Sequence, residues 1–461
     1  MSRKTNLLYI FADQWRAHGV GYANEDKVQT PNIDQFAKES MVFSNAVSTF
    51  PLCSPHRASL MTGKYPFNVG MWTNCKNGLD EVIMLKPQEV CIGNVLKESG
   101  YRTGYIGKWH LDAAETNFEK NPKSGAVNWD AYTPPGERRQ GFDYWLSYGA
   151  DDNHLDPHYW ADSDKQIRPK KWSVEYETDK VLEYIDQRNQ GQEPFALFLS
   201  YNPPHLPYEL VPDEYYERYK EEPVHFRENV PKEFQTEELK TITRQYFAAI
   251  TGIDSQFKRI YDYLKENHME EDTLIVLSAD HGEMLGSHGL MSKNIWYEEA
   301  VRIPLMIRKK GSIEPGTNDV IFASPDHMPT LLDLLDLGIP DTCQGYSHKN
   351  NIFGLSSEDP QHAFLCSYPG MPKMVKEFQK RGLNHKCFGW RGVRTKRYTY
   401  VVYNGYAPDE KQKILLYDNN EDPYQLNPTV LENRQQSELI IELDGYLKDY
   451  LEKTRDPFLL G

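Results

Sequence analysis

Short apolar runs, rich in β-branched and aromatic residues, alternate with longer amphipathic stretches along residues 6–280. The apolar runs predict strands at residues 6–11, 104–106, 195–199 and 273–277. The amphipathic stretches predict helices at residues 32–39, 92–99, 174–188 and 237–266. Strands that alternate with helices favour a parallel sheet with helices on both faces. We therefore expect a doubly wound α/β fold, with a large mixed, mostly parallel sheet flanked by helices.

Two segments depart from this pattern. Residues 112–171 are dense in Pro, Gly, Trp, Tyr and His with little periodicity, which predicts a long excursion from the sheet. After Pro340 a hairpin pattern at 392–403 and 414–417 precedes a helix with leucines at four-residue spacing from Leu439 to Leu451. We expect a catalytic domain over residues 1–345 and a smaller C-terminal α+β subdomain, containing an antiparallel sheet, over residues 346–461.

Charge and composition exclude several classes of partner. The 461 residues carry 52 Lys and Arg against 67 Asp and Glu, a net charge of -15 that disfavours nucleic acid and anionic membrane surfaces. No apolar stretch is long enough to span a membrane, and Asp13 interrupts the apolar run that begins at Leu7. The six cysteines form no CxxC pair, so neither a disulfide scaffold nor a zinc site is indicated. The sequence predicts a cytoplasmic protein.

Chemically active residues follow four of the predicted strands. They are Asp13 with Gln14, Lys108 with His110, His205, and Asp280 with His281 and Glu283. In open parallel sheets the ligand crevice lies at the carboxyl ends of the strands, so these clusters would converge on one rim. Taken singly, each is also typical of a helix cap or a turn. Their joint occurrence favours a site.

The clusters make chemical sense as a set. Asp13, Gln14, Asp280 and His281 offer two carboxylates, an amide oxygen and an imidazole, which suit one divalent cation. The remaining candidates are cationic or transfer protons, namely Lys108, His110, His205 and Lys293. A metal surrounded by Lys and His predicts a site for a tetrahedral oxyanion.

A cysteine lies in the segment CSPHRASLMTG, which begins at Cys53. A helix that starts near Pro55 would place Arg57 one turn further on, and a thiol beside an arginine and a helix N-terminus has a lowered pKa. A buried structural cysteine is the alternative that these residues alone leave open.

This segment resembles the signature of the type I sulfatases of the alkaline phosphatase superfamily, C-x-P-x-R followed by T-G. The strand end FADQ, the segment GKWH, the loop PHLP at 204–207 and the segment SADHGE, with a lysine about a dozen residues on, resemble further motifs of that family in the same order. The resemblance extends over residues 6–310. The C-terminal hundred residues resemble the family's small subdomain in outline.

The resemblance implies a role for each matching residue. Cys53 would be converted by a maturation enzyme to formylglycine, whose hydrate acts as nucleophile and metal ligand. Asp13, Gln14, Asp280 and His281 would complete the shell of a Ca²⁺ ion. Arg57 and Lys108 would stabilise the hydrate and the transferring sulfate, and His110 would take the proton when the aldehyde re-forms. His205 and Lys293 would bind sulfate oxygens and assist the leaving alcohol.

Two positions depart from the usual family pattern. Gln14 stands where many sulfatases carry a second aspartate, and His281 where asparagine is frequent. Imidazole suits Mn²⁺ or Zn²⁺ better than Ca²⁺, so these metals remain alternatives. The same pairs also resemble the phosphonate monoester hydrolases and phosphodiesterases of the superfamily, which are the alternative activity.

The segments around residues 133–145 and 382–395 resemble those of carbohydrate sulfatases that act on N-acetylglucosamine or uronate sulfates. Aromatic and polar residues in the excursion and the C-terminal subdomain predict the substrate pocket. They are His154, His158, His385, Trp390 and Arg391.

An arylsulfatase is the alternative within the sulfatases. A non-catalytic anion-binding protein is disfavoured because the signature is intact. An acidic exterior around a cationic pocket favours a small, singly sulfated substrate over a densely sulfated polymer.

Overall fold

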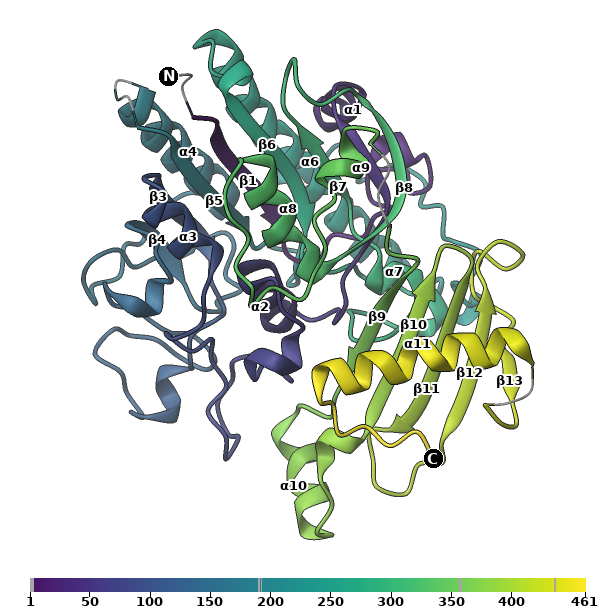
Figure 1. Cartoon of the computed structure of the whole chain (residues 1–461). Coiled ribbons are helices and arrows are strands. Elements are labelled where there is room, and N and C mark those ends of the chain that lie inside the picture. The colour runs from purple at the N-terminus through teal and green to yellow at the C-terminus, as the bar shows by residue number, and fades with distance from the viewer. Residues whose placement is uncertain (1–3, 190, 192, 356–358, 435–436) are drawn as a thin grey trace.

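A computed structural model describes residues 4–189, 191, 193–355, 359–434 and 437–461. An eight-stranded sheet forms its centre (Figure 1), in the order β4-β3-β5-β1-β6-β7-β2-β8. Its strands are β1 (Asn6–Ala12), β2 (Met41–Val47), β3 (Arg102–Lys108), β4 (Tyr144–Tyr148), β5 (Phe195–Tyr201), β6 (Thr273–Ala279), β7 (Leu305–Arg308) and β8 (Gly316–Ala323). Only β7 runs antiparallel to its neighbours in this sheet. The predicted mostly parallel α/β fold is confirmed.

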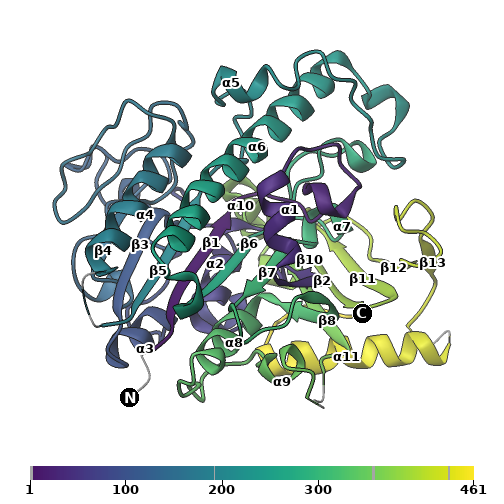
Figure 2. The same cartoon turned by 90° about the horizontal axis from the view of Figure 1, so that it is seen from above.

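Helices cover both faces of this sheet, as Figure 2 shows from above. On one side lie α1 (Pro31–Lys38), α4 (Ser173–Asn189) and α6 (Glu237–Glu266), and on the other α3 (Ile92–Glu98) and α8 (His327–Leu334). The helix α2 (Cys53–Thr62) packs against α3 and α8. Every residue of β1, β5 and β6 is buried, as expected for central strands covered on two faces.

The predicted helices and strands lie close to their expected limits, whereas several short strands were not predicted. The helix predicted over 237–266 has those limits, and its N-cap Thr236 accepts a hydrogen bond from the backbone of Leu239. Residues 112–171 are not wholly an excursion, because β4 lies within them and pairs with β3 at the sheet edge. That strand is only five residues long, and the irregular sequence on either side conceals it.

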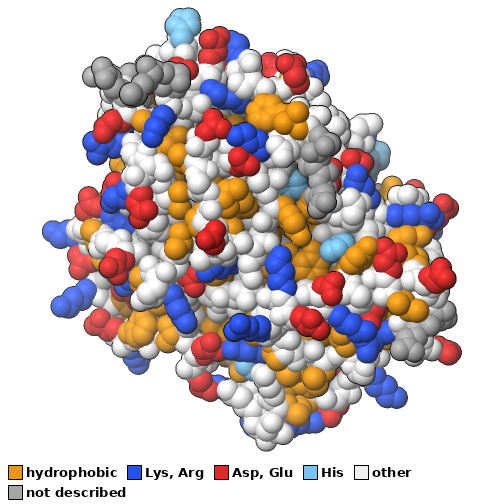
Figure 3. Space-filling view, in the orientation of Figure 1, with side chains coloured by type: hydrophobic (Ala, Val, Ile, Leu, Met, Phe, Trp, Pro, Cys, Tyr) orange, Lys and Arg blue, Asp and Glu red, His pale blue; other side chains and the backbone are white. Residues whose placement is uncertain are grey.

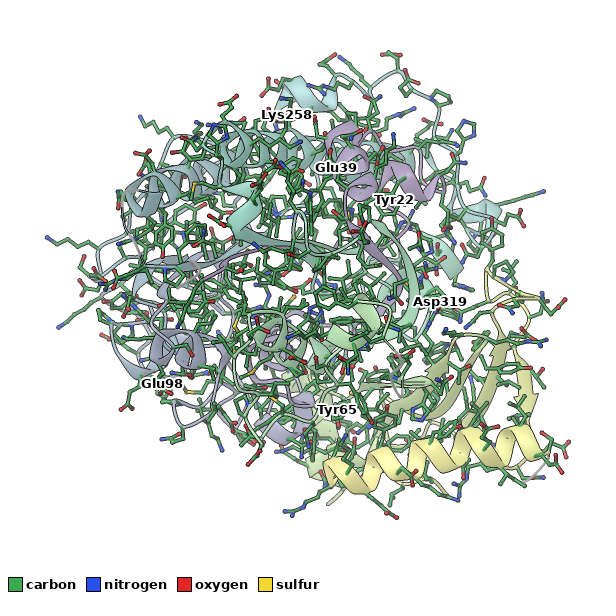
Figure 4. All side chains as sticks on the ribbon, turned by 45° about the horizontal axis from the view of Figure 1, so that its top comes forward. Tyr22, Glu39, Tyr65, Glu98, Lys258 and Asp319 are labelled. Carbon is green, nitrogen blue, oxygen red and sulfur yellow. The ribbon has the colours of Figure 1, made fainter. Side chains whose placement is uncertain are left out.

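A second, five-stranded antiparallel sheet follows in the order β13-β12-β11-β10-β9. Its strands are β9 (His362–Ser367), β10 (Gly389–Thr395), β11 (Tyr398–Gly405), β12 (Lys413–Asp418) and β13 (Thr429–Leu431). The helix α11 (Glu438–Thr454) lies across one face of it (Figure 1). Tyr65, labelled in Figure 4, meets Tyr450 of α11 with ring centroids 5.5 Å apart.

The remaining helices are short: α5 (Asp213–Tyr216), α7 (Glu298–Val301), α9 (Lys349–Ile352) and α10 (Pro372–Lys380). The boundary predicted at residue 345 falls between the two sheets and remains a prediction. No helix within the described residues is long and apolar enough to cross a membrane.

A buried ion pair joins the smaller sheet to α7, the helix that lies between β6 and β7 in the sequence. Arg394 of β10 donates to both carboxylate oxygens of Glu298 in α7, at 2.7 and 2.9 Å, and both side chains are nearly inaccessible to solvent. A second pair, between Lys396 and Asp319 of β8, also links the sheets but lies in solvent. Figure 4 shows Asp319 on the side of the large sheet that faces the smaller one.

Removing one partner should cost far more stability at the buried pair than at the exposed pair, because it leaves a charge unpaired in the interior. Among the described residues, replacing Arg394 by methionine leaves the buried Glu298 carboxylate with Arg302, at 3.6 Å, as its ion-pair partner. We expect Arg394→Met to lower the free energy of unfolding, measured by urea denaturation, by about 3 to 5 kcal/mol. Lys396→Met is the matched control and should cost at most about 1 kcal/mol. Equal losses in the two variants would contradict this assignment.

Candidate active site

Four neighbouring strands end at one rim of the large sheet. β1 pairs in parallel with β5 and β6, so that Ala12 lies opposite Tyr201 and Ala279, and β3 is parallel to β5. The residues at these ends therefore emerge on the same edge. They are Asp13 and Gln14 after β1, Lys108 and His110 at the end of β3, His205 after β5, and Asp280 and His281 after β6.

The backbone at this rim is unusual. Gln14 and His110 both adopt left-handed conformations, with φ of 66° and 51°, which non-glycine residues seldom adopt. Gly107 has a φ of 96°, and a Cβ there would lie 2.1 Å from the carbonyl oxygen of Ser200. Only glycine fits between β3 and β5 at this point, which explains the glycine before Lys108.

Cys53 is the first residue of α2 and is only 2% exposed. The helix begins two residues before the predicted start near Pro55. The reason is a contact distant in sequence: the side-chain oxygen of Asn74 accepts a hydrogen bond from the Ser54 backbone N–H, at 2.9 Å. This satisfies one of the first-turn donors and holds the thiol at the helix N-terminus.

Arg57, one turn further along α2, bridges the ends of β1 and β6. Its guanidinium donates to Asp13 Oδ2 and Asp280 Oδ2, each at 3.0 Å, and to the Lys108 carbonyl and Ser200 Oγ. All of these side chains are buried. One oxygen of each carboxylate is thereby neutralised.

The opposite carboxylate oxygens face a single point. His281 Nε2 lies 3.4 Å from Asp13 Oδ1 and 3.5 Å from Asp280 Oδ1, and Cys53 Sγ lies 3.4 Å from the same nitrogen. His281 Nδ1 is 3.0 Å from the Gly282 carbonyl, which fixes Nδ1 as the donor and leaves the lone pair on Nε2. The four side chains offer ligand atoms within 4.8 Å of one another, so they could hold a metal ion.

The pKa values of the two aspartates reflect how closely charged groups are packed around this point. Burial and the neighbouring Asp13 raise the pKa of Asp280 to about 6. Burial also opposes ionisation of Asp13, but Lys108 and His205 hold its pKa well below the usual range. A bound cation would relieve the repulsion between these two carboxylates.

Basic groups surround Cys53 on the cavity side. Lys108 Nζ lies 2.8 Å from Asp13 Oδ2, and Lys293 Nζ donates to Gln14 Oε1. Burial and Asp13 act to raise the pKa of the Cys53 thiol, but Lys293 and Lys108 outweigh them and hold it well below its ordinary value. The site favours a negatively charged group at this position.

Two histidines border the same space. His205 Nδ1 is 3.3 Å from Asp152, and although burial and Lys293 oppose it, Asp152 and Asp13 raise the pKa of His205 to about 9. Burial lowers the pKa of His110, whose Nδ1 has no hydrogen-bond partner among the described residues. One histidine is therefore suited to donate a proton and the other to accept one.

These groups line a cavity of about 810 Å³, within the range of small-ligand sites. Cys53, Lys108, His110, His205 and Lys293 all contribute to its wall. Several cations around one buried point can neutralise the charge of a tetrahedral oxyanion, and a protonated histidine can protonate its leaving group.

Comparisons with known proteins decide the family. The sulfatase family model matches residues 5–337, and a model for the C-terminal region of N-sulphoglucosamine sulphohydrolase matches residues 286–453. The chain belongs to the sulfatase family. The membership that the resemblance to sulfatases predicted is confirmed, and the protein is a sulfuric ester hydrolase.

Curated and solved relatives agree along nearly the whole chain. An endo-4-O-sulfatase of Bacteroides thetaiotaomicron is 36% identical, covering 98% of this chain and 93% of that protein. An ulvan-active sulfatase of Formosa agariphila is 32% identical, covering 99% and 82%. A solved structure from a study of glycosaminoglycan metabolism in B. thetaiotaomicron superposes with a TM-score of 0.88 at 34% identity, covering 98% and 97%.

The five residues predicted to bind substrate do not line the cavity of this sulfatase. Arg391 is fully buried and pairs with both oxygens of Asp456, at 2.6 and 3.0 Å. The ring of His385 contacts that of Trp72 at a tilt, with ring centroids 4.7 Å apart. His154 Nε2 is 2.8 Å from the His205 carbonyl, so it supports the loop that carries His205.

Trp390 also lies outside the cavity wall and contacts Asn294, the residue after Lys293. Its indole N–H donates to the carbonyl of Asn294, at 3.3 Å, and Ser367 of β9 donates to the Asn294 side chain, at 2.8 Å. Asn294 follows Lys293 directly and has a φ of 75°. The smaller sheet of this sulfatase thus fixes the loop that presents Lys293.

Several cavity residues were not predicted from the sequence. They are Asn74, Lys76, Trp129 and Asp152 in the wall, and Asn202, which accepts a hydrogen bond from Lys108. Asn202 directly follows β5, so the strand-end argument could have found it. The others lie in irregular segments that carry no periodic signal.

His158 is held between two carboxylates behind the cavity wall. Its Nε2 lies 2.7 Å from Asp130 and its Nδ1 lies 3.4 Å from Asp151. Burial opposes protonation, but hydrogen bonds to Asp130 and Asp151 raise the pKa of His158 to about 9. Because this pKa exceeds the unfolded value, the contribution to stability is complete below pH ~6.5 and is lost as pH rises through ~9.

We expect the loss of the His158 contribution to lower the free energy of unfolding by about 3 kcal/mol between these pH values. His158→Gln should remove that part of the decline, as measured by urea denaturation at several pH values. The exposed His225 serves as control, and His225→Gln should leave the pH profile of the wild type intact. A His158→Gln profile parallel to that of the wild type would show that His158 is neutral in the folded protein.

Proposed function

We propose that this sulfatase releases sulfate from a sulfated carbohydrate, through a formylglycine hydrate derived from Cys53 and a bound divalent metal. One observation carries the proposal. The Cys53 side chain faces the same buried point as Asp13, Asp280 and His281, beneath a cavity lined by Lys108, Lys293 and His205.

The donor set fits a divalent cation. Asp13 and Asp280 each direct one oxygen at the point that His281 Nε2 also faces. The Sγ atom of Cys53 is the fourth ligand atom of the set. Gln14 lies beside it, since its backbone N–H donates to Asp280 Oδ1 at 3.0 Å. We propose Ca²⁺, with Mn²⁺ and Zn²⁺ as the alternatives that the imidazole favours. When bound, the metal supplies positive charge that polarises a sulfate oxygen.

The remaining steps belong to side chains of this protein. Lys108 and Lys293 bind oxygens of the sulfate group, and Arg57 holds the two carboxylates in place. Protonated His205 donates to the oxygen of the departing alcohol. His110 accepts a proton at Nδ1, the nitrogen that has no other partner among the described residues. The formylglycine hydrate supplies the attacking oxygen.

A carbohydrate suits the outer part of the cavity. Its wall includes Trp129, Asn74, Asp151, Asp152 and Asn153, an aromatic ring among polar side chains. Aromatic faces and hydrogen-bonding groups match the faces and hydroxyls of a sugar. The names of the curated relatives, an endo-4-O-sulfatase and an ulvan-active sulfatase, support the same class of substrate.

Sulfate release from defined substrates tests the proposal. The protein is produced with a formylglycine-generating enzyme, and its intact mass should fall by about 18 Da when the thiol becomes an aldehyde. That protein should release sulfate faster from sulfated N-acetylhexosamines or uronate-containing disaccharides than from p-nitrophenyl sulfate or a phosphodiester. Ion chromatography of free sulfate and phosphate measures the rates.

Cys53→Ala is the matched variant and should lose at least a thousandfold in kcat, because it has no nucleophile. Faster turnover of the phosphodiester would instead assign the phosphodiesterase activity, and faster turnover of p-nitrophenyl sulfate would assign an arylsulfatase. An unchanged mass together with full activity would refute the formylglycine step.

Metal removal tests the cation site. A metal present at 100 times its Kd stabilises the folded protein by about 2.7 kcal/mol. Adding Ca²⁺ after chelation with EDTA should therefore raise the midpoint of thermal unfolding by a few degrees, and Asp280→Asn should abolish this shift. Asp151→Asn, which alters a cavity carboxylate outside the cluster, should retain it. A larger shift with Mn²⁺ or Zn²⁺ would overturn the assignment of Ca²⁺.

A further inference from the structure

Lys76 lies in the active-site cavity but takes no part in the cluster around Cys53. It is only 4% exposed and borders two adjoining hollows. One is the cavity that contains Cys53, and the other, of about 300 Å³, is lined largely by apolar residues such as Met291 and Met374. Lys76 therefore stands at the junction of the two.

The ammonium of Lys76 has no carboxylate within ion-pair distance among the described residues. Its Nζ lies 4.6 Å from the centre of the Trp129 ring and 3.5 Å from Met371 Sδ. By contrast, Lys108 pairs with Asp13 and His205 with Asp152 in the same cavity. A buried cation without a counter-ion is costly, and burial lowers the pKa of Lys76 to about 8. An anionic ligand would offset this cost.

The backbone that carries Lys76 is fixed to the catalytic elements. The Cys75 N–H donates to Ser54 Oγ at 3.1 Å, and the Cys75 carbonyl lies 3.2 Å from His110 Nε2. The Lys76 carbonyl accepts from Asn117 Nδ2, also at 3.2 Å. These bonds hold the backbone of Lys76 in a defined position relative to Cys53, and its side chain extends from there onto Trp129 and Met371.

We propose that Lys76, seated on Trp129, binds a second anionic group of the substrate, one that does not react. This inference rests on the proposed function and narrows its substrate class to saccharides with a carboxylate or a further sulfate beside the ester that is cleaved. The aromatic face beneath the ammonium holds the cation without neutralising it. The adjoining hollow gives space for the part of the substrate beyond the reacting sugar.

The test compares Lys76→Met with the wild type on three sulfate esters. The first is a neutral N-acetylhexosamine monosulfate, the second a disaccharide with the same sulfated residue joined to a uronate, and the third a disulfated hexosamine. Methionine retains the apolar length of the side chain and removes its charge. We expect Lys76→Met to lose at least tenfold more kcat/KM on a doubly anionic substrate than on the neutral sugar monosulfate. The loss should come from a higher KM and not from a lower kcat.

Lys76→Arg should restore most of the lost discrimination because it keeps the charge. Lys386→Met is the matched control: that lysine also lies over a tryptophan, Trp72, but pairs with Glu81 and does not line the cavity. Lys386→Met should leave the ratios of kcat/KM between the three esters at the wild-type values. Thermal unfolding identifies any variant that is not folded.

Each result of this comparison either identifies the second anionic group or overturns the inference. A selective loss on the uronate disaccharide identifies a carboxylate as the second anion, and a selective loss on the disulfated sugar identifies a sulfate. Equal losses on all three esters overturn the inference while the proposed function stands. If the wild type releases no sulfate from any of them, the proposed function itself fails.

Discussion

The active site depends on one guanidinium that holds two like charges together. Arg57 donates to Asp13 and Asp280, whose buried carboxylates would otherwise repel each other at the ends of the adjacent strands β1 and β6. The same side chain reaches the Lys108 carbonyl and Ser200, so it ties the ends of four strands to the helix that carries Cys53. By satisfying one oxygen of each carboxylate, it leaves the other two facing a single point.

Topology accounts for the part of the site that the sequence predicts. Parallel strands end on the same edge of a sheet, so Asp13, Lys108, His205 and Asp280 were expected on one rim once the α/β pattern was recognised, and the structure places them there. The C-x-P-x-R resemblance then indicated which cysteine they surround. No comparable rule exists for the outer pocket, where Asn74, Lys76 and Trp129 come from irregular segments.

The residues predicted to bind substrate include charged side chains that have partners within the protein. Arg391 was a reasonable candidate for a carboxylate, and it does bind one, but that carboxylate is Asp456 of the same chain. His158 likewise finds its acids in Asp130 and Asp151. A buried charge is usually paired within the protein, and the sequence does not show which of the cations are left without a partner.

The surface and the cavity differ in their electrostatics. On the face seen in Figure 3 acidic and basic side chains are interspersed, as the mixed composition would suggest. Inside, Arg57, Lys108, Lys293 and Lys76 gather around one cavity and its floor. The net charge of -15 is summed over the whole chain, so it does not reveal the cations that gather at this cavity.

The contact between Trp390 and the Asn294 carbonyl has a consequence for how the protein is made. A ribosome synthesises Lys293 well before β9 and β10, the strands whose side chains hold the neighbouring Asn294. A nascent chain that has folded only its large sheet would already contain Cys53 and its surrounding carboxylates. The loop that carries Lys293 would acquire these contacts last, when the smaller sheet closes, so the order of translation separates formation of the surroundings of Cys53 from the final placement of Lys293.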